Sequence, residues 1–311
     1  MGGPPTGGPL TGDLLTGGVA LLVPGGRGQL GQDLLAIGGH VRALSSAELD
    51  ITDAAAVADR VSEFSAWARA EGLAPVVVNA AAYTAVDDAE TDEDRALAVN
   101  ALGPELLALS CREHGVPLLH VSTDYVFPGD ATAPYEPDDA TGPRSAYGRT
   151  KLAGEQRVLA AWERSWVVRT AWVYGAGGSN FVKTMAKLAG QRESLSVVDD
   201  QRGSPTWSAD LAAGLVELAA ATTGPSAPAQ RVLHATGGGE TTWFGFARAV
   251  FEELGLDPER VRPCGTEDFP RPAPRPAYSV LSPKAWESAG LTPLRPWREA
   301  LTVAVRDGVA G

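Results

Sequence analysis

Residues 19–31 read Val19-Ala-Leu-Leu-Val23 followed by Pro24-Gly-Gly-Arg-Gly-Gln-Leu-Gly31. The apolar run predicts a buried parallel strand, and Gln32-Asp-Leu-Leu-Ala36 after the glycines predicts a helix. Gly25, Gly28 and Gly31 are spaced to permit a tight turn, close approach of the backbone to a pyrophosphate, and close helix–strand packing. The free N–H groups at the start of the helix would then face the phosphates. Because the chain contains 36 glycines, a tight turn without a ligand remains the alternative.

Short apolar runs and helical patterns alternate along the next 140 residues. We expect further strands at Val41–Leu44, Pro75–Asn79, Pro117–Thr123 and Trp166–Thr170, and a helix from Leu97 to Glu113. This alternation predicts an α/β fold of the Rossmann type, with a doubly wound parallel sheet. Ligands bind beyond the carboxyl ends of the strands in such sheets. One crevice should therefore be lined by the segments that follow four strands: Gly25–Gly31, Ala82–Thr84, Ser122–Asp124 and Trp172.

The run Ser145-Ala-Tyr-Gly-Arg-Thr-Lys-Leu-Ala-Gly-Glu155 places Tyr147 and Lys151 four residues apart, on one face of a helix. A nearby ammonium lowers the pKa of a phenol from about 10 toward the working pH. Such a phenol can give its proton to a carbonyl oxygen as a hydride reaches the carbonyl carbon. A chance spacing is the alternative, and the glycine loop and the strand order weigh against it.

The pattern changes after residue 170. We expect helices at Asn180–Gln191, Asp210–Thr222 and Thr241–Gly255, a strand at Leu195–Val198, and an ordered loop or mobile lid at Arg262–Arg275. Residues 231–236 form a short apolar run that should return to the sheet. The predicted organisation is a disordered tail over residues 1–18, an NAD(P)-binding domain over 19–170, and a smaller substrate-binding domain over 171–311, partly interleaved with the first.

Composition excludes several classes of function. The net charge of −12 argues against a nucleic-acid surface, and no apolar run approaches the ~20 residues of a membrane span. Cys111 and Cys264 provide neither a disulfide framework nor metal-ligand spacing, which suits a reducing cytoplasm. The four histidines have no ligand spacing either, so no metal is expected. The Gly-, Pro- and Thr-rich residues 1–18 have no basic region of the kind that begins a signal peptide.

The residues described so far resemble the dTDP-4-dehydrorhamnose reductase family of the extended short-chain dehydrogenases/reductases. The resemblance covers nearly everything after residue 19, in the order typical of the family. Besides Gly28–Gly31 and Tyr147–Glu155, the similar runs are Val78–Asp87, Val121–Phe127, Arg169–Tyr174, Asn180–Met185, Asp200–Thr206 and Arg275–Leu281.

This resemblance implies a role for each matching position. Tyr147 would donate the proton, Lys151 would bind the nicotinamide ribose and lower the pKa of the tyrosine, and Thr123 would hydrogen-bond the keto oxygen. Asn100 would help to position the lysine. With the glycine-loop residues added, the expected cofactor contacts are Gly25, Gly28, Gln29, Leu30, Gly31, Asp50, Ile51, Ala82, Tyr83, Thr84, Tyr147 and Lys151. The expected substrate contacts are Thr84, Thr123, Asp124, Tyr125, Tyr147, Trp172 and Arg275.

Some of these positions also have purely structural interpretations. Thr123 could cap the segment after its strand, Trp172 could be core packing, and Arg275 could be a surface charge, although its planar fork suits a phosphate. Two positions depart from the family: Tyr278 replaces a frequent asparagine, and only Asp33 matches a glutamate implicated in magnesium-linked dimerisation. We therefore expect no metal, and either a monomer or a homodimer.

The end of the second strand indicates the cofactor. A carboxylate there would bind the 2′-hydroxyl of NAD, but Val41-Arg-Ala-Leu-Ser-Ser46 contains none, and Arg42 and two serines are near. We therefore expect NADPH, with NADH also permitted. The expected reaction is reduction of the C4 keto group of a dTDP-4-keto-6-deoxyhexose, giving dTDP-L-rhamnose or a related deoxysugar of a natural-product pathway. The alternatives are a nucleotide-sugar epimerase and a non-catalytic regulatory subunit of the same fold.

Overall fold

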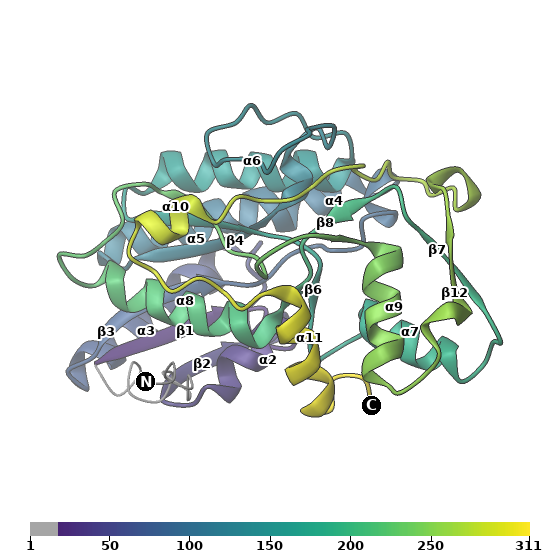
Figure 1. Ribbon diagram of the computed structural model, residues 1–311. Helices are drawn as coiled ribbons and strands as arrows, with labels where there is room; N and C mark the ends of the chain where they lie inside the picture. The colour runs from purple at the N-terminus through teal and green to yellow at the C-terminus, as the bar shows by residue number, and fades with distance from the viewer. Residues whose placement is uncertain (1–17) are drawn as a thin grey trace.

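The computed structural model describes residues 18–311, and its centre is a six-stranded parallel sheet in this part of the chain (Figure 1). The strand order is β10-β5-β4-β3-β1-β2, and every neighbouring pair is parallel. The predicted α/β fold with a doubly wound sheet is therefore confirmed. The strands are β1 (Val19–Pro24), β2 (His40–Leu44), β3 (Ala74–Asn79), β4 (Leu118–Thr123), β5 (Ser165–Thr170) and β10 (Val232–His234).

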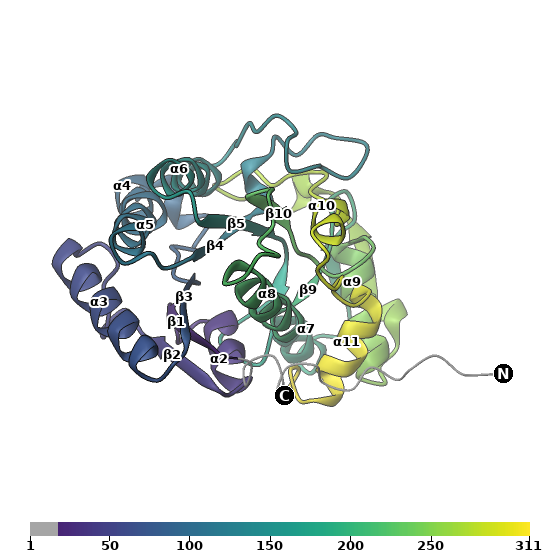
Figure 2. The ribbon, with the colours of Figure 1, turned by 90° about the vertical axis from the view of Figure 1, so that its left-hand side faces the viewer.

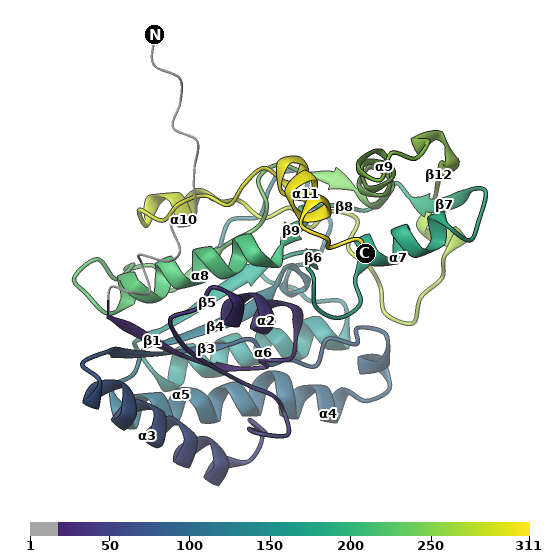
Figure 3. The same cartoon turned by 90° about the horizontal axis from the view of Figure 1, so that it is seen from below.

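Helices cover both faces of the sheet (Figures 2 and 3). Successive side chains of a strand point to opposite faces, so Leu22 of β1 packs with one helical layer and Leu21 with the other. Both leucines are fully buried, because a parallel sheet is covered on its two sides. The layer on the side of Leu22 contains α3 (Ala54–Ala70), α5 (Gly103–His114) and α6 (Ala146–Ala161), and that on the side of Leu21 contains α2 (Gln29–Ala36), α8 (Ser208–Thr222) and α10 (Lys284–Ser288).

A second hydrophobic cluster lies beyond the carboxyl end of the sheet, on the right of Figure 1. Its core includes Tyr174, Phe246, Phe251 and Leu301, all essentially buried. The elements around it are α7 (Phe181–Ala189), α9 (Trp243–Glu253), α11 (Trp297–Arg306) and the parallel pair β7 (Leu195–Val198) and β12 (Val261–Cys264). Two further short strand pairs occur in this part of the chain: β6 (Val173–Tyr174) with β9 (Thr206–Trp207), and β8 (Arg202–Gly203) with β11 (Thr241–Thr242).

The helix expected over Leu97–Glu113 is not continuous. It consists of α4 (Glu93–Leu97), a π-helical turn η2 (Ala98–Leu102) and α5. Pro104 lies at the start of α5 and has no N–H group, so the regular helical ladder cannot run through this point. A π-helical turn accommodates the interruption, and such turns are frequent at functional sites.

The segment Arg262–Arg275 is more regular than expected. Its first residues belong to β12, which pairs with β7 in register from Val261 opposite Leu195 to Cys264 opposite Val198. A single 3₁₀ turn, η5 (Thr266–Asp268), follows. The prolines in this segment argued against a strand. The β12–β7 pair consists of edge strands only, however, and Pro263 is tolerated at a sheet edge.

Two further expectations concern the N-terminal residues and membrane-spanning segments. The disordered tail expected over residues 1–18 lies, apart from Gly18, outside the described residues. Within residues 18–311, no helix combines the length and apolar character that a bilayer crossing requires.

Candidate active site

A cavity of about 860 Å³ opens at the carboxyl end of the central sheet. All four segments that were expected to share one crevice contribute to its wall. The site residues expected from the sequence that line it are Gly25, Gly28, Gln29, Leu30, Gly31, Asp50, Ile51, Ala82, Thr84, Thr123, Asp124, Tyr125, Tyr147, Lys151 and Trp172. Tyr83 and Arg275 are the two expected residues outside this wall.

The glycine loop between β1 and α2 leaves no room for side chains at two positions. A Cβ on Gly25 would lie 2.6 Å from the backbone nitrogen of Ala81, and φ at Gly25 is +87°. A Cβ on Gly31 would lie 2.4 Å from the carbonyl oxygen of Gly25. The loop is therefore folded tightly against the strand ends, and it exposes the N-terminus of α2 to the cavity in the manner of a pyrophosphate cradle.

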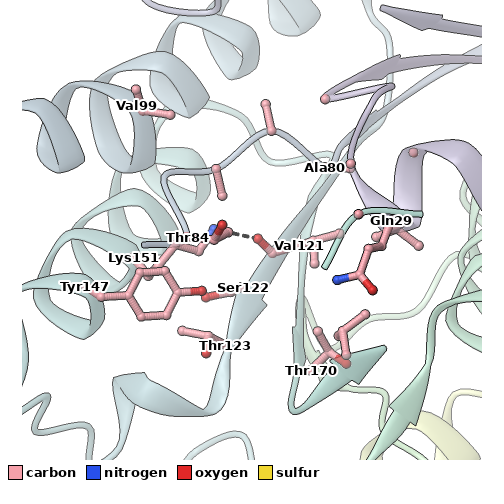
Figure 4. A pocket seen from close by; sticks show the side chains of 18 of the residues that line it. Gln29, Ala80, Thr84, Val99, Val121, Ser122, Thr123, Tyr147, Lys151 and Thr170 are labelled. Carbon is pink, nitrogen blue, oxygen red and sulfur yellow. Dashed lines mark hydrogen bonds between the residues drawn. The ribbon is translucent and has the colours of Figure 1, made fainter. Parts of the chain in front are cut away.

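Tyr147 and Lys151 extend from the first turns of α6 into the cavity, as Figure 4 shows. Ser145 caps this helix by accepting a hydrogen bond from the N–H of Gly148. Gly148 and Gly154 let the helix approach its neighbours, since a Cβ on Gly154 would lie 2.0 Å from the carbonyl oxygen of Asn100. The spacing of four residues places both functional side chains toward the end of β4, where the hydroxyl of Tyr147 faces Ser122 and Thr123 (Figure 4).

The pKa values of this pair differ from the expectation. Burial raises the pKa of Tyr147 to about 12, against the opposing effect of the Thr123 hydroxyl and with a further increase from Asp124. Burial lowers the pKa of Lys151 to about 8, although the Glu155 carboxylate opposes this. The ammonium of Lys151 donates to the carbonyl oxygen of Val121 at 2.7 Å. The net pKa of Tyr147 is therefore raised by burial and not lowered as expected, and the phenol keeps its proton at neutral pH.

Thr123 has both of the roles considered for it. Its hydroxyl accepts a hydrogen bond from the N–H of Tyr125 and so caps the short 3₁₀ turn η3 (Asp124–Val126), and it also lines the cavity. The same hydroxyl donates to Asp124 at 2.9 Å. Burial raises the pKa of Asp124 to about 6, against the hydroxyls of Ser279 and Thr123. A hydroxyl and a carboxyl group at the end of β4 are therefore close enough to Tyr147 to affect its pKa.

A buried ion pair stabilises this end of β4. The guanidinium of Arg169 on β5 contacts Glu155 on α6 through two nitrogens, at 2.7 and 3.0 Å, and the side chains are only 5% and 2% exposed. Ser122 also donates to Glu155, at 2.5 Å. Through Ser122, Arg169 and Glu155, these bonds connect β4, β5 and α6. They therefore hold in place the end of β4, where Thr123 follows Ser122.

An aromatic pair closes the other side of the cavity. Trp172 has φ of +49°, the single positive value at a non-glycine residue in the described chain, and this conformation is strained for an L-residue. Its ring stacks on Trp243 with centroids 3.6 Å apart and planes at 8°, and both rings line the cavity. Gly203 also lies against this ring, since a Cβ on Gly203 would lie 2.5 Å from it. No signal in the sequence pointed to Trp243, which follows the helix cap Thr242 and could equally have been a core residue.

Three expected contacts have other partners in the structure. Arg275 donates to Asp87 at 2.9 Å and to the carbonyl oxygen of Ala273, and it is 19% exposed. Tyr83 packs against the same small buried cluster of alanines as Tyr147. Asn100 binds the backbone N–H and carbonyl of Tyr83 and the hydroxyl of Thr150. Asn100 therefore holds the Ala82–Thr84 loop, and the lysine is held by Val121 instead.

The residues near the end of β2 also differ from the expectation. The guanidinium of Arg42 lies 3.7 Å from the centroid of the Trp67 ring, an arrangement typical of a cation–π contact, and Arg42 is absent from the cavity wall. The wall at this point contains Ser45, Ser46 and Arg27. Arg27 lies within the glycine run, where the sequence reasoning considered the glycines, Gln29 and Leu30 but not the arginine.

The described residues offer no group of three or more metal-binding side chains. Asp33, the counterpart of the glutamate implicated in magnesium-linked dimerisation, accepts a hydrogen bond from the hydroxyl of Ser208. Burial raises the pKa of this carboxyl, against the effect of Ser208.

Comparisons with known proteins agree with one another. The family model of the RmlD substrate binding domain matches residues 19–309. A dTDP-4-dehydrorhamnose reductase of Mycobacterium tuberculosis is 51% identical over 92% of this chain and 92% of its own length. A dTDP-4-keto-6-deoxy-D-glucose reductase of Streptomyces niveus is 43% identical, over 91% and 95%. The crystal structure of dTDP-4-dehydrorhamnose reductase from Bacillus anthracis in complex with NADP has a TM-score of 0.85 and 33% identity, covering 93% of this chain and 99% of that one.

Proposed function

This chain belongs to the RmlD substrate binding domain family, and from that membership we propose that it is an NADPH-dependent oxidoreductase. Its substrate would be a dTDP-4-keto-6-deoxyhexose, which it would reduce at C4 to dTDP-L-rhamnose or a related deoxysugar. The observation that carries the proposal is the convergence of Thr123, Tyr147 and Lys151 on one wall of the cavity whose opposite wall is the glycine loop.

The cavity is compatible with a dinucleotide. Its length runs from Ser45 and Ser46, past the glycine loop, to Tyr147 and Trp172. The absence of side chains at Gly25 and Gly31 lets the loop fold closely against the strand ends, so that a pyrophosphate could approach the start of α2. The bound cofactor would supply the hydride, and the residues of this chain would bind and orient both reactants.

The proposed proton donor is Tyr147. Because the pKa of Tyr147 is raised to about 12, the phenol is protonated at neutral pH and can donate to the keto oxygen as negative charge develops there. Thr123 would give a second hydrogen bond to the same oxygen. Lys151 would hold the ribose hydroxyls and, as a nearby cation, reduce the cost of the phenolate that proton donation leaves behind.

The same proposal assigns a role to each of the two expected domains. Residues 19–170 would bind the cofactor, and residues 171–311 would form most of the substrate site, with Arg275 and Trp172 on the side of the sugar nucleotide. The remaining expected cofactor and substrate contacts keep their proposed roles. The enzyme would act in the cytoplasm, as a monomer or homodimer, without a nucleic-acid partner.

The direct test is NADPH consumption, followed at 340 nm. We expect turnover with dTDP-4-keto-6-deoxy-L-lyxo-hexose and much less with its unepimerised D-xylo isomer. Preference for the D-xylo isomer would instead indicate a reductase like the Streptomyces niveus relative. Interconversion of the two isomers without NADPH consumption would support the epimerase, and NADPH binding without turnover of either sugar would support the non-catalytic subunit.

Replacing Trp243 with alanine tests the aromatic pair. The stack holds Trp172 in its strained conformation, and aromatic pairs contribute about 0.5–1.5 kcal/mol beyond their buried area. We expect Trp243→Ala to raise KM for the keto sugar by about 3- to 10-fold, leave the NADPH Kd unchanged, and be rescued by Trp243→Phe. Phe244→Ala is the matched control, because Phe244 belongs to the same helix and cluster but is absent from the cavity wall. Equal effects of the two alanine variants would contradict a positioning role.

A further inference from the structure

The start of α6 is held by a carboxylate from a distant part of the chain. Ala146 and Tyr147 are the first two residues of this helix, and the first N–H groups of a helix have no partner within it. Ser145 accepts a hydrogen bond from the N–H of Gly148, whereas the N–H of Ala146 donates to the Glu90 carboxylate at 2.8 Å. The first turn of α6 has no acidic residue of its own. Glu90 therefore supplies the negative charge that stabilises a helix N-terminus.

The segment that contains Glu90 also contacts the reactive tyrosine. Glu90 is the last residue of the 3₁₀ turn η1 (Asp88–Glu90). Its neighbour Ala89 belongs with Ala146 to a small buried cluster of alanines, and the Tyr147 ring packs against this cluster. One short segment thus binds the backbone immediately before Tyr147 and packs beneath its ring.

A second carboxylate contacts α6 at a point away from the cavity. Glu93 is the first residue of α4, which lies beside α6 in Figures 1 and 2. It accepts hydrogen bonds from two nitrogens of the Arg149 guanidinium, at 2.9 and 2.7 Å. The two side chains are 44% and 45% exposed, and exposed pairs contribute little to stability. Glu93 therefore carries the same charge as Glu90 and contacts the same helix, without binding the backbone before Tyr147.

We propose that Glu90 is a positioning residue for proton transfer, because it fixes the first turn of α6, and with it Tyr147, relative to the end of β4. The inference rests on the proposed function and adds a residue that lies outside the cavity wall. The Tyr147 hydroxyl faces Thr123 (Figure 4), and a displacement of about 1 Å between reacting groups can cost roughly 10²-fold in rate. Lys151 lies one turn further along α6 and is bonded to Val121. Loss of Glu90 should therefore impair proton transfer and spare cofactor binding.

The test combines turnover with amide hydrogen exchange in the full-length protein. For Glu90→Ala we expect kcat per NADPH-binding site to fall by roughly 10- to 100-fold, while KM for the keto sugar and Kd for NADPH change by less than about threefold. Glu90→Gln should restore kcat to within about threefold of the wild type, because an amide oxygen still accepts from Ala146. Without any ligand, the amides of residues 146–149 should exchange roughly 10-fold faster in Glu90→Ala and at nearly the wild-type rate in Glu90→Gln, as measured by mass spectrometry.

Glu93→Ala is the matched control, because it removes a neighbouring carboxylate and leaves the bond between Glu90 and Ala146 in place. Its kcat should equal that of the wild type. Wild-type kcat per site in Glu90→Ala would overturn the proposal, and if exchange were still faster, Glu90 would be a helix cap only. Equal losses of kcat in Glu90→Ala and Glu93→Ala would overturn it as well. If the wild type reduced neither sugar, the proposed function would fail, and the exchange rates would decide separately: unchanged exchange in Glu90→Ala would contradict the positioning role, and faster exchange would support it.

Discussion

Replacing Tyr147 with phenylalanine should reduce kcat by about 10²- to 10⁴-fold, the contribution usual for a positioned general acid. The ring fills the same space, so the cavity keeps its shape and the Kd for NADPH should change by less than about twofold. The cause is the missing proton donor, since Tyr147 is the buried phenol that faces Thr123 in the cavity. Steady-state assays with the keto sugar and a separate NADPH titration measure the two quantities.

Tyr174→Phe is the matched control for this substitution. Tyr174 is also a buried tyrosine, on β6 two residues after Trp172, but it is absent from the cavity wall and its hydroxyl has no hydrogen-bond partner among residues 18–311. Loss of the Tyr174 hydroxyl should leave kcat unchanged. If Tyr147→Phe retained wild-type turnover, proton donation by Tyr147 would be wrong. If the wild type itself had no turnover while binding NADPH, the regulatory-subunit alternative would gain support.

Replacing Arg169 with methionine should have the largest effect on stability. It would leave the Glu155 carboxylate buried at 2% exposure without its cation, and breaking a buried pair from one side costs about 3–5 kcal/mol. Equilibrium urea denaturation should show this loss in the free energy of unfolding. Because Ser122 also donates to Glu155, we expect the support of β4 beneath Thr123 to loosen and kcat to fall as well.

The double variant Arg169→Met with Glu155→Leu tests the physical reason. Well-packed apolar pairs often replace buried ion pairs at little cost, so most of the lost stability should return. Arg60→Met is the surface control, because Arg60 and Glu63 are 42% and 59% exposed and exposed pairs contribute about 0–1 kcal/mol. A double variant no more stable than Arg169→Met would show that the cost arises from lost packing or from the hydrogen bond to Pro137, and not from the unpaired carboxylate.

The raised pKa of Tyr147 is a property that residue spacing cannot predict. Residues four apart on a helix share a face, so the sequence could place Tyr147 and Lys151 together at the cavity. The pKa of each group depends on burial and on its other partners. Only the packed structure shows that the Lys151 ammonium donates to Val121 and that burial raises the pKa of Tyr147.

The partners of the arginines could not be predicted for a related reason. Arg42 lies nearest in sequence to the end of β2, but its side chain points to Trp67 in α3. Arg27 reaches the same strand end because Gly25 and Gly26 bind Leu44, a contact between segments almost twenty residues apart. Arg275 is similarly turned toward Asp87, 188 residues away. No local sequence pattern indicates which of several distant residues a long side chain will contact.

The sequence by itself determined the fold class, the parallel sheet, the glycine loop and the meeting of Thr123 and Tyr147 at one strand end. These features follow from apolar periodicity, from the steric needs of glycine positions and from the rule that strand ends in a parallel sheet meet. The tertiary structure alone decided the direction of the pKa shift at Tyr147, the stack of Trp172 on Trp243, the π-helical turn before Pro104, and the contact of Arg42 with Trp67. Each of these depends on burial or on a contact between segments that are distant in the chain, and such contacts have free energies that short-range patterns do not encode.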